Sequence, residues 1–189
     1  MKNFSAQSFP IPFIHTSARR ALVAFFFALA IGLAAQIRIP LPGTPVPMTL
    51  QTLALFIGAA LLGRHYATQM AAWYVGLGAI GLPMFAGGAA GAGVLIGATG
   101  GYLIGFIAAA TFIGYLQPHV RTIVTQLGLF FAASLIIFLC GASWLAIALH
   151  LTAQQAIGLG VLPFVAGDLL KITLACAAIR GQKKLFSLF

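Results

Sequence analysis

The segment VLPFVAGDLLKITLACAAI, residues 161–179, contains the only acidic residue of the chain, Asp168, within an otherwise apolar run. An ionised side chain at the centre of a membrane helix costs about 2.5–3.5 kcal/mol on insertion scales. Lys171 follows three residues later, so both side chains project from one face of a helix, where they can pair or hold one polar molecule between them. We predict that this helix organises the bundle and that the pair binds a polar ligand.

The overall composition is that of an integral membrane protein. The chain has 189 residues, of which 61% are hydrophobic and 6% are charged, whereas about 25% of residues are charged in a typical soluble protein. At about 20 residues for each membrane-spanning helix, this length suits one all-α bundle of about six helices. We therefore predict a polytopic membrane protein with a single domain over residues 1–189, in which residues 1–18 form a cytoplasmic N-terminal tail.

Six apolar stretches are the predicted helices. They cover residues 21–37, 48–63, 67–85, 94–116, 124–142 and 162–179. The partly apolar stretch 143–160 fits either a re-entrant or an interfacial segment, and its periodicity does not decide between the two.

Two loops between these helices have a distinctive composition. Residues 38–47 contain four prolines, which fix φ and withhold backbone donors, so we expect an extended, stiff loop that can act as a lid or a spacer. Residues 87–93 are rich in glycine, but neither Gly-Lys-Ser nor Gly-Lys-Thr follows them. This loop is therefore not a nucleotide-binding P-loop, and the chain has no recognisable motif for ATP.

The basic residues predict the orientation in the membrane. With both termini in the cytoplasm, Arg38 alone lies in an outer loop, and the cytoplasmic basic residues are Lys2, Arg19, Arg20, Arg64, Arg121, Arg180, Lys183 and Lys184. This distribution follows the positive-inside rule, so the net charge of +9 reflects topology and not binding to nucleic acid. The two distinctive loops and the connection before the last helix then gather on the outer side, where a ligand would enter.

Catalysis is poorly supported by the residues present. Membrane enzymes that act on phosphate esters need several carboxylates for metal ions, and an intramembrane aspartyl protease needs two, but this chain has one. Its histidines all fall at segment ends: His15, His65, His119 and His150. We therefore predict no catalytic site, no metal and no cofactor, and we favour a binding protein.

The polar and aromatic residues near the predicted helix ends are the candidate ligand contacts. A carboxylate beside an ammonium group suits a small planar cyclic urea or amide, whose donors and acceptor lie on one edge. Glycine-lined helix faces and aromatic rings would hold the apolar part of such a molecule. The candidate binding residues are Asp168, Lys171, Gln51, Thr49, Tyr74, Phe85, Gly88, Thr99, Gly101 and Tyr102.

Small residues repeat at four-residue spacing in the first helix, at Ala24 and Ala28 and again at Ala30 and Ala34. Such a stripe lets another helix approach closely. Packing within the bundle and docking onto a partner subunit are equally compatible with the pattern.

Four motifs in a fixed order resemble a known family. They are IPLPGTPVPMTLQ at residues 39–51, GAIGLP at 78–83, GATGGY at 97–102 and PFVAGDLLK at 163–171. With these motifs the chain resembles the BioY family, the biotin-binding S components of energy-coupling factor (ECF) vitamin transporters.

The resemblance implies a six-helix fold in the cytoplasmic membrane, biotin as the transported ligand, and a complex with a transmembrane coupling protein and two ATP-binding subunits. It associates Asp168 and Lys171 with the ureido ring of biotin. It also makes Ala24 and Ala28 the candidate docking face for the coupling protein.

Several positions depart from the family pattern. Ala98 replaces a frequent proline, Ala89 and Ala90 stand in the loop where some members carry asparagine, and Leu103 stands where some carry arginine. The partner of the biotin carboxylate is therefore open between Arg38 and the backbone N–H groups of residues 87–93. An S component for another small vitamin, and a structural membrane protein locked by the pair at residues 168 and 171, are the alternative functions.

Overall fold

The computed structural model describes residues 17–186. The predicted N-terminal tail therefore lies outside the described residues, except for its last two, which belong to the first helix. The elements in chain order are α1 (Ser17–Gln36), β1 (Arg38–Ile39), β2 (Met48–Thr49), α2 (Gln51–Ala79), a 3₁₀ turn η1 (Ala86–Gly88), α3 (Gly93–Ile96), α4 (Gly100–Leu116), η2 (Gln117–His119), α5 (Ile123–Ala148), α6 (Ala153–Gly160), η3 (Leu162–Phe164) and α7 (Val165–Phe186).

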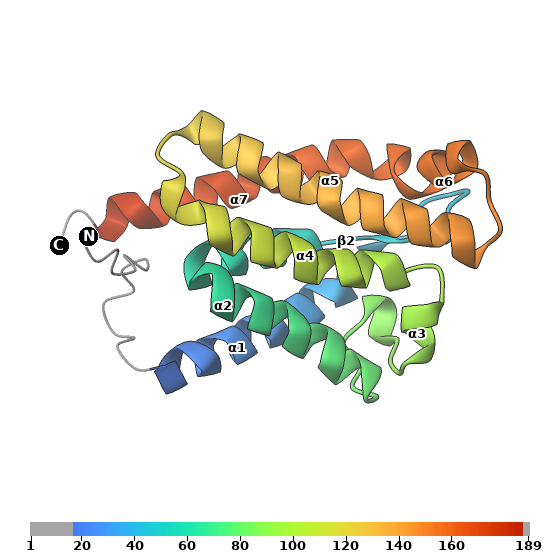
Figure 1. Ribbon diagram of the computed structural model, residues 1–189, viewed down its shortest axis with the longest axis horizontal. Coiled ribbons are helices and arrows are strands. Elements are labelled where there is room, and N and C mark those ends of the chain that lie inside the picture. The colour runs from blue at the N-terminus through green and yellow to red at the C-terminus, as the bar shows by residue number, and fades with distance from the viewer. Residues whose placement is uncertain (1–16, 187–189) are drawn as a thin grey trace, which may run out of the picture.

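Long helices run roughly side by side along the molecule (Figure 1). The described part of the chain contains six long helical segments: α1, the two halves of α2, α4, α5, and the unit formed by α6, η3 and α7. Four stretches within it are long and apolar enough to cross a bilayer, at Ser17–Gln36, Gly100–His119, Ile123–Ala148 and Ala153–Gln182. The predicted six-helix, all-α bundle is confirmed, whereas membrane crossing by the two halves of α2 stays a prediction.

A glycine divides α2 into its two halves. Gly63 has φ 72° and ψ 169°, a conformation that side-chain-bearing residues rarely adopt. Gly114 of α4 lies against this break, where a β-carbon would come within 2.7 Å of the backbone nitrogen of Arg64. Helix α2 therefore contains two of the predicted helices, which were expected at residues 48–63 and 67–85. The later one begins directly after Gly63 and not at residue 67.

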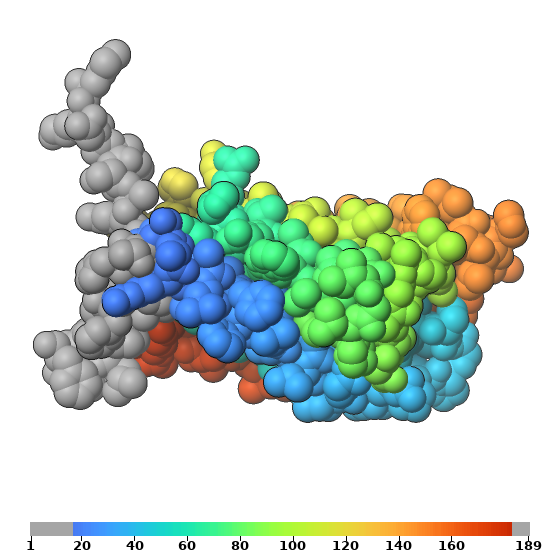
Figure 2. Space-filling model, turned by 90° about the horizontal axis from the view of Figure 1, so that it is seen from below, coloured from blue at the N-terminus to red at the C-terminus, as the bar shows by residue number. Residues whose placement is uncertain are grey.

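The irregular segments gather at the end of the bundle away from the start of α1 and the end of α7 (Figure 1). The proline-rich loop is extended, as predicted, and its ends pair as a short antiparallel hairpin in which Arg38 opposes Thr49. Strand β2 occupies residues 48–49, so the second helix begins at Gln51, three residues later than predicted. Figure 2 shows the hairpin segment (light blue) beside the loop and short helix of residues 81–96 (green) on one face.

The predicted third and fourth helices differ from the observed ones at this same end. Helix α2 stops at Ala79 and not at residue 85, because Gly81 turns with φ 109° and Pro83 follows. The fourth helix is interrupted at residues 97–99, where Gly97 is extended and its carbonyl accepts a hydrogen bond of 2.9 Å from the Trp144 indole. Only Gly100–Leu116 forms the long helix α4.

The stretch 143–160 is mostly helical. Helix α5 continues to Ala148. Thr152 then starts α6 with a capping box, in which the Thr152 hydroxyl accepts from the backbone N–H of Gln155. Helix α6 lies beside the end of α5 (Figure 1). Thr152 and Gln155, two of the polar residues in this stretch, therefore cap a helix.

The alanine stripe of α1 packs inside the bundle. Ala24 and Ala28 are fully buried, together with Ile31 and Ala35 on the same face. A docking face needs exposed side chains, so the assignment of Ala24 and Ala28 to a partner interface is corrected, and packing is the role that the structure gives them. Gly32 continues this face toward the irregular end, where the Met84 side chain lies against it.

Glycines allow α4 and α5 to approach each other closely. A β-carbon on Gly101 would lie 2.2 Å from the Trp144 β-carbon and 2.4 Å from the Cys140 carbonyl oxygen. Across the same interface, a β-carbon on Gly141 would lie 2.2 Å from the Tyr102 ring. These contacts place backbone against backbone, as small residues do in membrane helix packing.

This interface predicts a contrast between two glycines. Gly101→Ala should destabilise the protein by about 1–3 kcal/mol through overpacking, whereas Gly128→Ala in α5, with no atom near its β-carbon position, should be neutral or stabilising because alanine favours helix. Thermal unfolding of the purified protein in detergent measures both. Equal unfolding temperatures for the two variants would contradict the packing described here.

Candidate functional site

A cavity of about 290 Å³ lies among the irregular segments and the adjacent ends of α2, α4, α5 and α7. Its size is at the low end of the range for small-molecule sites. The lining residues come from distant parts of the sequence: Arg38, Pro45, Val46, Pro47, Met48, Thr49, Gln51, Thr52, Phe85, Ala86, Ala89, Val94, Thr99, Tyr102, Leu103, Phe106, Ile137, Phe138, Phe164, Asp168 and Lys171.

Asp168 forms the polar end of the cavity. Its side chain is 4% exposed, and a buried carboxylate requires donors and a cation to offset its lost hydration. Lys171 Nζ lies 3.2 Å from Oδ1, the Thr52 hydroxyl donates to Oδ1 at 3.4 Å, and the Ser134 hydroxyl donates to Oδ2. These partners come from α7, α2 and α5, so the carboxylate joins three helices.

A second chain of hydrogen bonds leads from Lys171 toward α2. Lys171 as a whole is 7% exposed, and its ammonium donates to the Thr49 carbonyl at 3.3 Å. The Thr49 hydroxyl in turn donates to Gln51 Oε1 at 2.7 Å. The Gln51 amide then donates to the Tyr74 hydroxyl, which lies behind the cavity wall. The start of α2 is therefore held in a fixed orientation against the charged pair.

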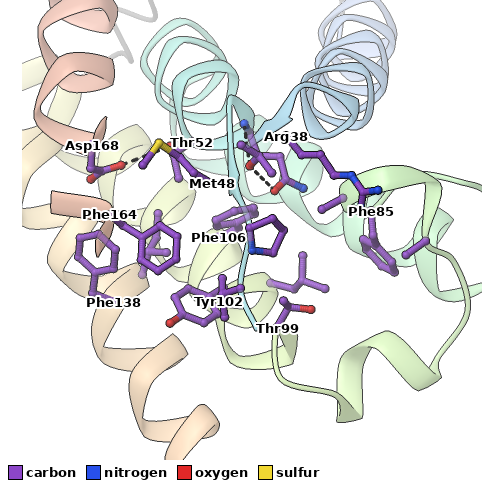
Figure 3. A pocket seen from close by; sticks show the side chains of 18 of the residues that line it. Arg38, Met48, Thr52, Phe85, Thr99, Tyr102, Phe106, Phe138, Phe164 and Asp168 are labelled. Carbon is purple, nitrogen blue, oxygen red and sulfur yellow. Dashed lines mark hydrogen bonds between the residues drawn. The ribbon is translucent and has the colours of Figure 1, made fainter. Parts of the chain in front are cut away.

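Aromatic rings form much of the remaining wall (Figure 3). Tyr102, Phe106, Phe138 and Phe164 line the cavity on the sides contributed by α4, α5 and η3. The Tyr102 hydroxyl donates to the Gly160 carbonyl at 2.7 Å, so its ring is held in place. A ligand here would meet hydrogen-bonding groups at one end and aromatic surface along its length.

The glycine-rich segment is attached to the bundle through α1. The Gln36 amide donates to the carbonyls of Gly32, Pro83 and Phe85 at 3.0–3.3 Å. The Phe85 ring packs against Gly78, where a β-carbon would lie 2.2 Å from it, and edge-on against Tyr74. This attachment places Phe85 in the cavity wall.

The structure brings seven of the ten predicted binding residues together around this cavity, namely Asp168, Lys171, Gln51, Thr49, Phe85, Thr99 and Tyr102. The other three do not line it. Tyr74 supports Gln51 from behind, Gly101 faces α5, and Gly88 lies in the η1 turn outside the lining.

Sequence reasoning missed two residues that touch the carboxylate, Thr52 and Ser134. Thr52 lies one residue after Gln51, and this proximity to a predicted contact is the only signal that the sequence offers. Ser134 lies in an apolar run, and only the rotation of α5 brings its hydroxyl to Asp168. Phe106, Phe138 and Phe164 likewise carry no signal that separates a cavity wall from an ordinary core.

The fold and this cavity define a class: a multi-pass helical membrane protein with a small-molecule site at one end of its bundle. The chain belongs to the BioY family, whose family model matches residues 5–187. This membership confirms the resemblance drawn from the four motifs and places the chain in a family of transporters and not of enzymes.

Curated relatives and a solved structure agree with this membership. The chain is 41% identical to the biotin transporter BioY of Thermotoga maritima over 167 residues, which cover 88% of this chain and 97% of that protein. The chain is also 34% identical to the biotin transporter BioY of Rhodobacter capsulatus, over 80% of this chain and 85% of that protein. A crystal structure of the S component for biotin from an ECF-type ABC transporter has the same fold, with a TM-score of 0.81. The two chains are 24% identical, and the match covers 90% of this chain and 95% of that one.

The hydrogen bonds at Asp168 predict a cost for removing one donor. Ser134→Ala should destabilise the protein by about 1–3 kcal/mol, because a buried acceptor then lacks a partner. Ser143→Ala on the exposed side of the same helix is the matched control and should have little effect. Thermal unfolding in detergent measures both, and an unchanged Ser134→Ala protein would argue against the hydrogen bond.

Proposed function

We propose that the chain is the biotin-binding S component of an ECF transporter in the cytoplasmic membrane. It captures biotin from outside the cell and releases it inward. The observation that carries the proposal is the buried pair Asp168 and Lys171 on the wall of a cavity of ligand size. The similarity to the biotin transporters of Thermotoga maritima and Rhodobacter capsulatus supports it.

The chemistry of the cavity matches the two parts of biotin. A ureido ring presents N–H donors and a carbonyl acceptor, which are complementary to the Asp168 carboxylate and the Lys171 ammonium. The aromatic wall suits the apolar remainder of the molecule. Thr49, Gln51 and Thr99 supply further hydrogen-bonding groups around the same space.

Energy for release comes, in this proposal, from partner proteins. The chain has no nucleotide-binding motif, so a transmembrane coupling protein and two ATP-binding subunits supply the driving force. Since Ala24 and Ala28 are buried, the docking face for that coupling protein must use other residues.

The main alternative is a structural membrane protein in which the charged pair locks α7 in place. The network formed by Ser134, Thr52 and the Thr49 carbonyl would serve that role equally well. The cavity beside the pair favours the binding function, because a locking pair has no need of an adjacent space lined by aromatic rings. An S component for another small vitamin is distinguished by competition for binding.

Equilibrium binding of labelled biotin to the detergent-purified protein tests the proposal. Asp168→Asn and Lys171→Met should each weaken binding by 2 kcal/mol or more, about thirtyfold, because each removes the charge complementary to the ureido ring. Thr173→Val, at an exposed position of the same helix, is the control and should bind normally. Absence of binding by folded wild-type protein would refute the biotin assignment and favour the structural alternative.

The proposed orientation makes a separate prediction. The start of α1, the break in α2 and the end of α7 lie at one end of the bundle and the hairpin at the other (Figure 1), and basic residues at the first end assign it to the cytoplasm. In a background with both native cysteines replaced by alanine, Pro42→Cys should react with a membrane-impermeant maleimide on intact cells. His65→Cys should react only after permeabilisation, and the reverse pattern would invert the orientation.

A further inference from the structure

The cavity has two cationic side chains, and they lie apart. Lys171 is bound to Asp168 at 3.2 Å. Arg38 lines the cavity from β1, and Figure 3 shows it with Phe85 on the side opposite to Asp168. The cavity therefore has a charge-neutral polar end and a separate cationic end, with aromatic surface between them.

No side chain of the protein can neutralise Arg38. The sequence contains one acidic residue, Asp168, and its carboxylate is shared among Lys171, Thr52 and Ser134. Arg38 is exposed at the edge of the cavity, so its guanidinium is open to an anionic group that a ligand brings there, and it attracts such a group over a short distance. An anionic group that binds Arg38 therefore comes from a ligand and not from an acidic side chain of the protein.

The backbone around Arg38 makes room for its guanidinium. A β-carbon on Gly87 would lie 2.4 Å from Nη1 and 2.5 Å from Cζ of Arg38, so only a glycine at this position lets the group lie against the loop. Gly87 also has φ 70°, which glycine adopts readily. Pairing of β1 with β2 sets the position of the Arg38 backbone beside Thr49.

Two backbone donors of the glycine-rich loop are committed to carbonyls within the protein. The Gly88 amide donates to the Phe85 carbonyl at 3.1 Å, and the Gly91 amide donates to the Gly78 carbonyl at 2.7 Å. Neither glycine lines the cavity. Ala89 of the same loop does line the cavity, but Arg38 is the donor at this end that carries a positive charge and can offer two parallel N–H groups to an anion.

From these observations we infer that Arg38 binds the carboxylate of the ligand and makes the site selective for an acid over its uncharged analogues. This inference rests on the proposed function, and it assigns carboxylate binding to the end of the cavity opposite to Asp168. A guanidinium can hold a carboxylate through two parallel N–H···O bonds, which a lysine cannot reproduce. The ligand then spans the cavity, with its neutral hydrogen-bonding head at Asp168 and its anionic end at Arg38.

The test compares biotin with biotinamide, in which the carboxylate is replaced by a primary amide. Equilibrium binding of both is measured on the full-length protein in detergent, for wild type, Arg38→Gln, Arg38→Lys and the control Arg121→Gln at an exposed position. Wild type should bind the acid about tenfold to a hundredfold more tightly than the amide. Arg38→Gln should lose this preference by weakening acid binding alone, Arg38→Lys should retain part of it, and the control should match wild type.

Each other outcome overturns the inference in a distinguishable way. Equal weakening of acid and amide by Arg38→Gln would mean that Arg38 only maintains the loop, since the loss would not depend on the carboxylate. Tight binding of both ligands by wild type without any preference would refute carboxylate recognition and leave the proposed function standing. Binding of neither ligand by folded wild type would refute the proposed function itself, and the assignment of Arg38 with it.

Discussion

The burial of one carboxylate is the constraint on which the rest of this structure depends. Asp168 gives up its hydration and receives donors from α2, α5 and its own helix. Removing any one of them leaves a buried charged group short of partners. The helices are therefore held at the one arrangement in which all donors reach the carboxylate, and the cavity forms next to that meeting point because the charged pair cannot be covered by apolar side chains alone.

Small residues make this arrangement sterically possible. Gly101 lets α4 approach the α5 backbone, Gly141 makes room for the Tyr102 ring, and Gly114 brings α4 against the backbone at the break in α2. Helices in a bilayer gain little from apolar burial against each other, so close van der Waals packing of this kind supplies much of their association. The bundle is thus tightly packed where α4 meets α5 and α2, and the cavity lies at the end where proline and glycine interrupt the helices.

The sequence predicted the number and order of the helices and the importance of Asp168 and Lys171, because hydropathy and the cost of a buried charge are local properties. It did not predict Ser134 as a partner of the carboxylate, since the rotation of α5 decides which residue of an apolar run faces inward. A small-residue stripe has the same spacing on an inward or an outward face, which is why the sequence left packing and docking open for Ala24 and Ala28, and the structure buries both. The Thr152 to Gln155 capping box is a local signal that the sequence does offer for α6, whereas the packing of α6 against α5 is a tertiary feature.

The two ends of the cavity are built from segments that lie far apart in the chain: the hairpin follows the first helix, whereas the charged pair belongs to the last one. Lys171 and Thr49, which meet across this separation, are 122 positions apart. Mutations in the hairpin that spare this contact between Lys171 and Thr49 can therefore reshape one end of the cavity while the charged pair stays in place. Divergence within such a fold can change which molecule is accepted while the buried charge that holds the helices together is conserved.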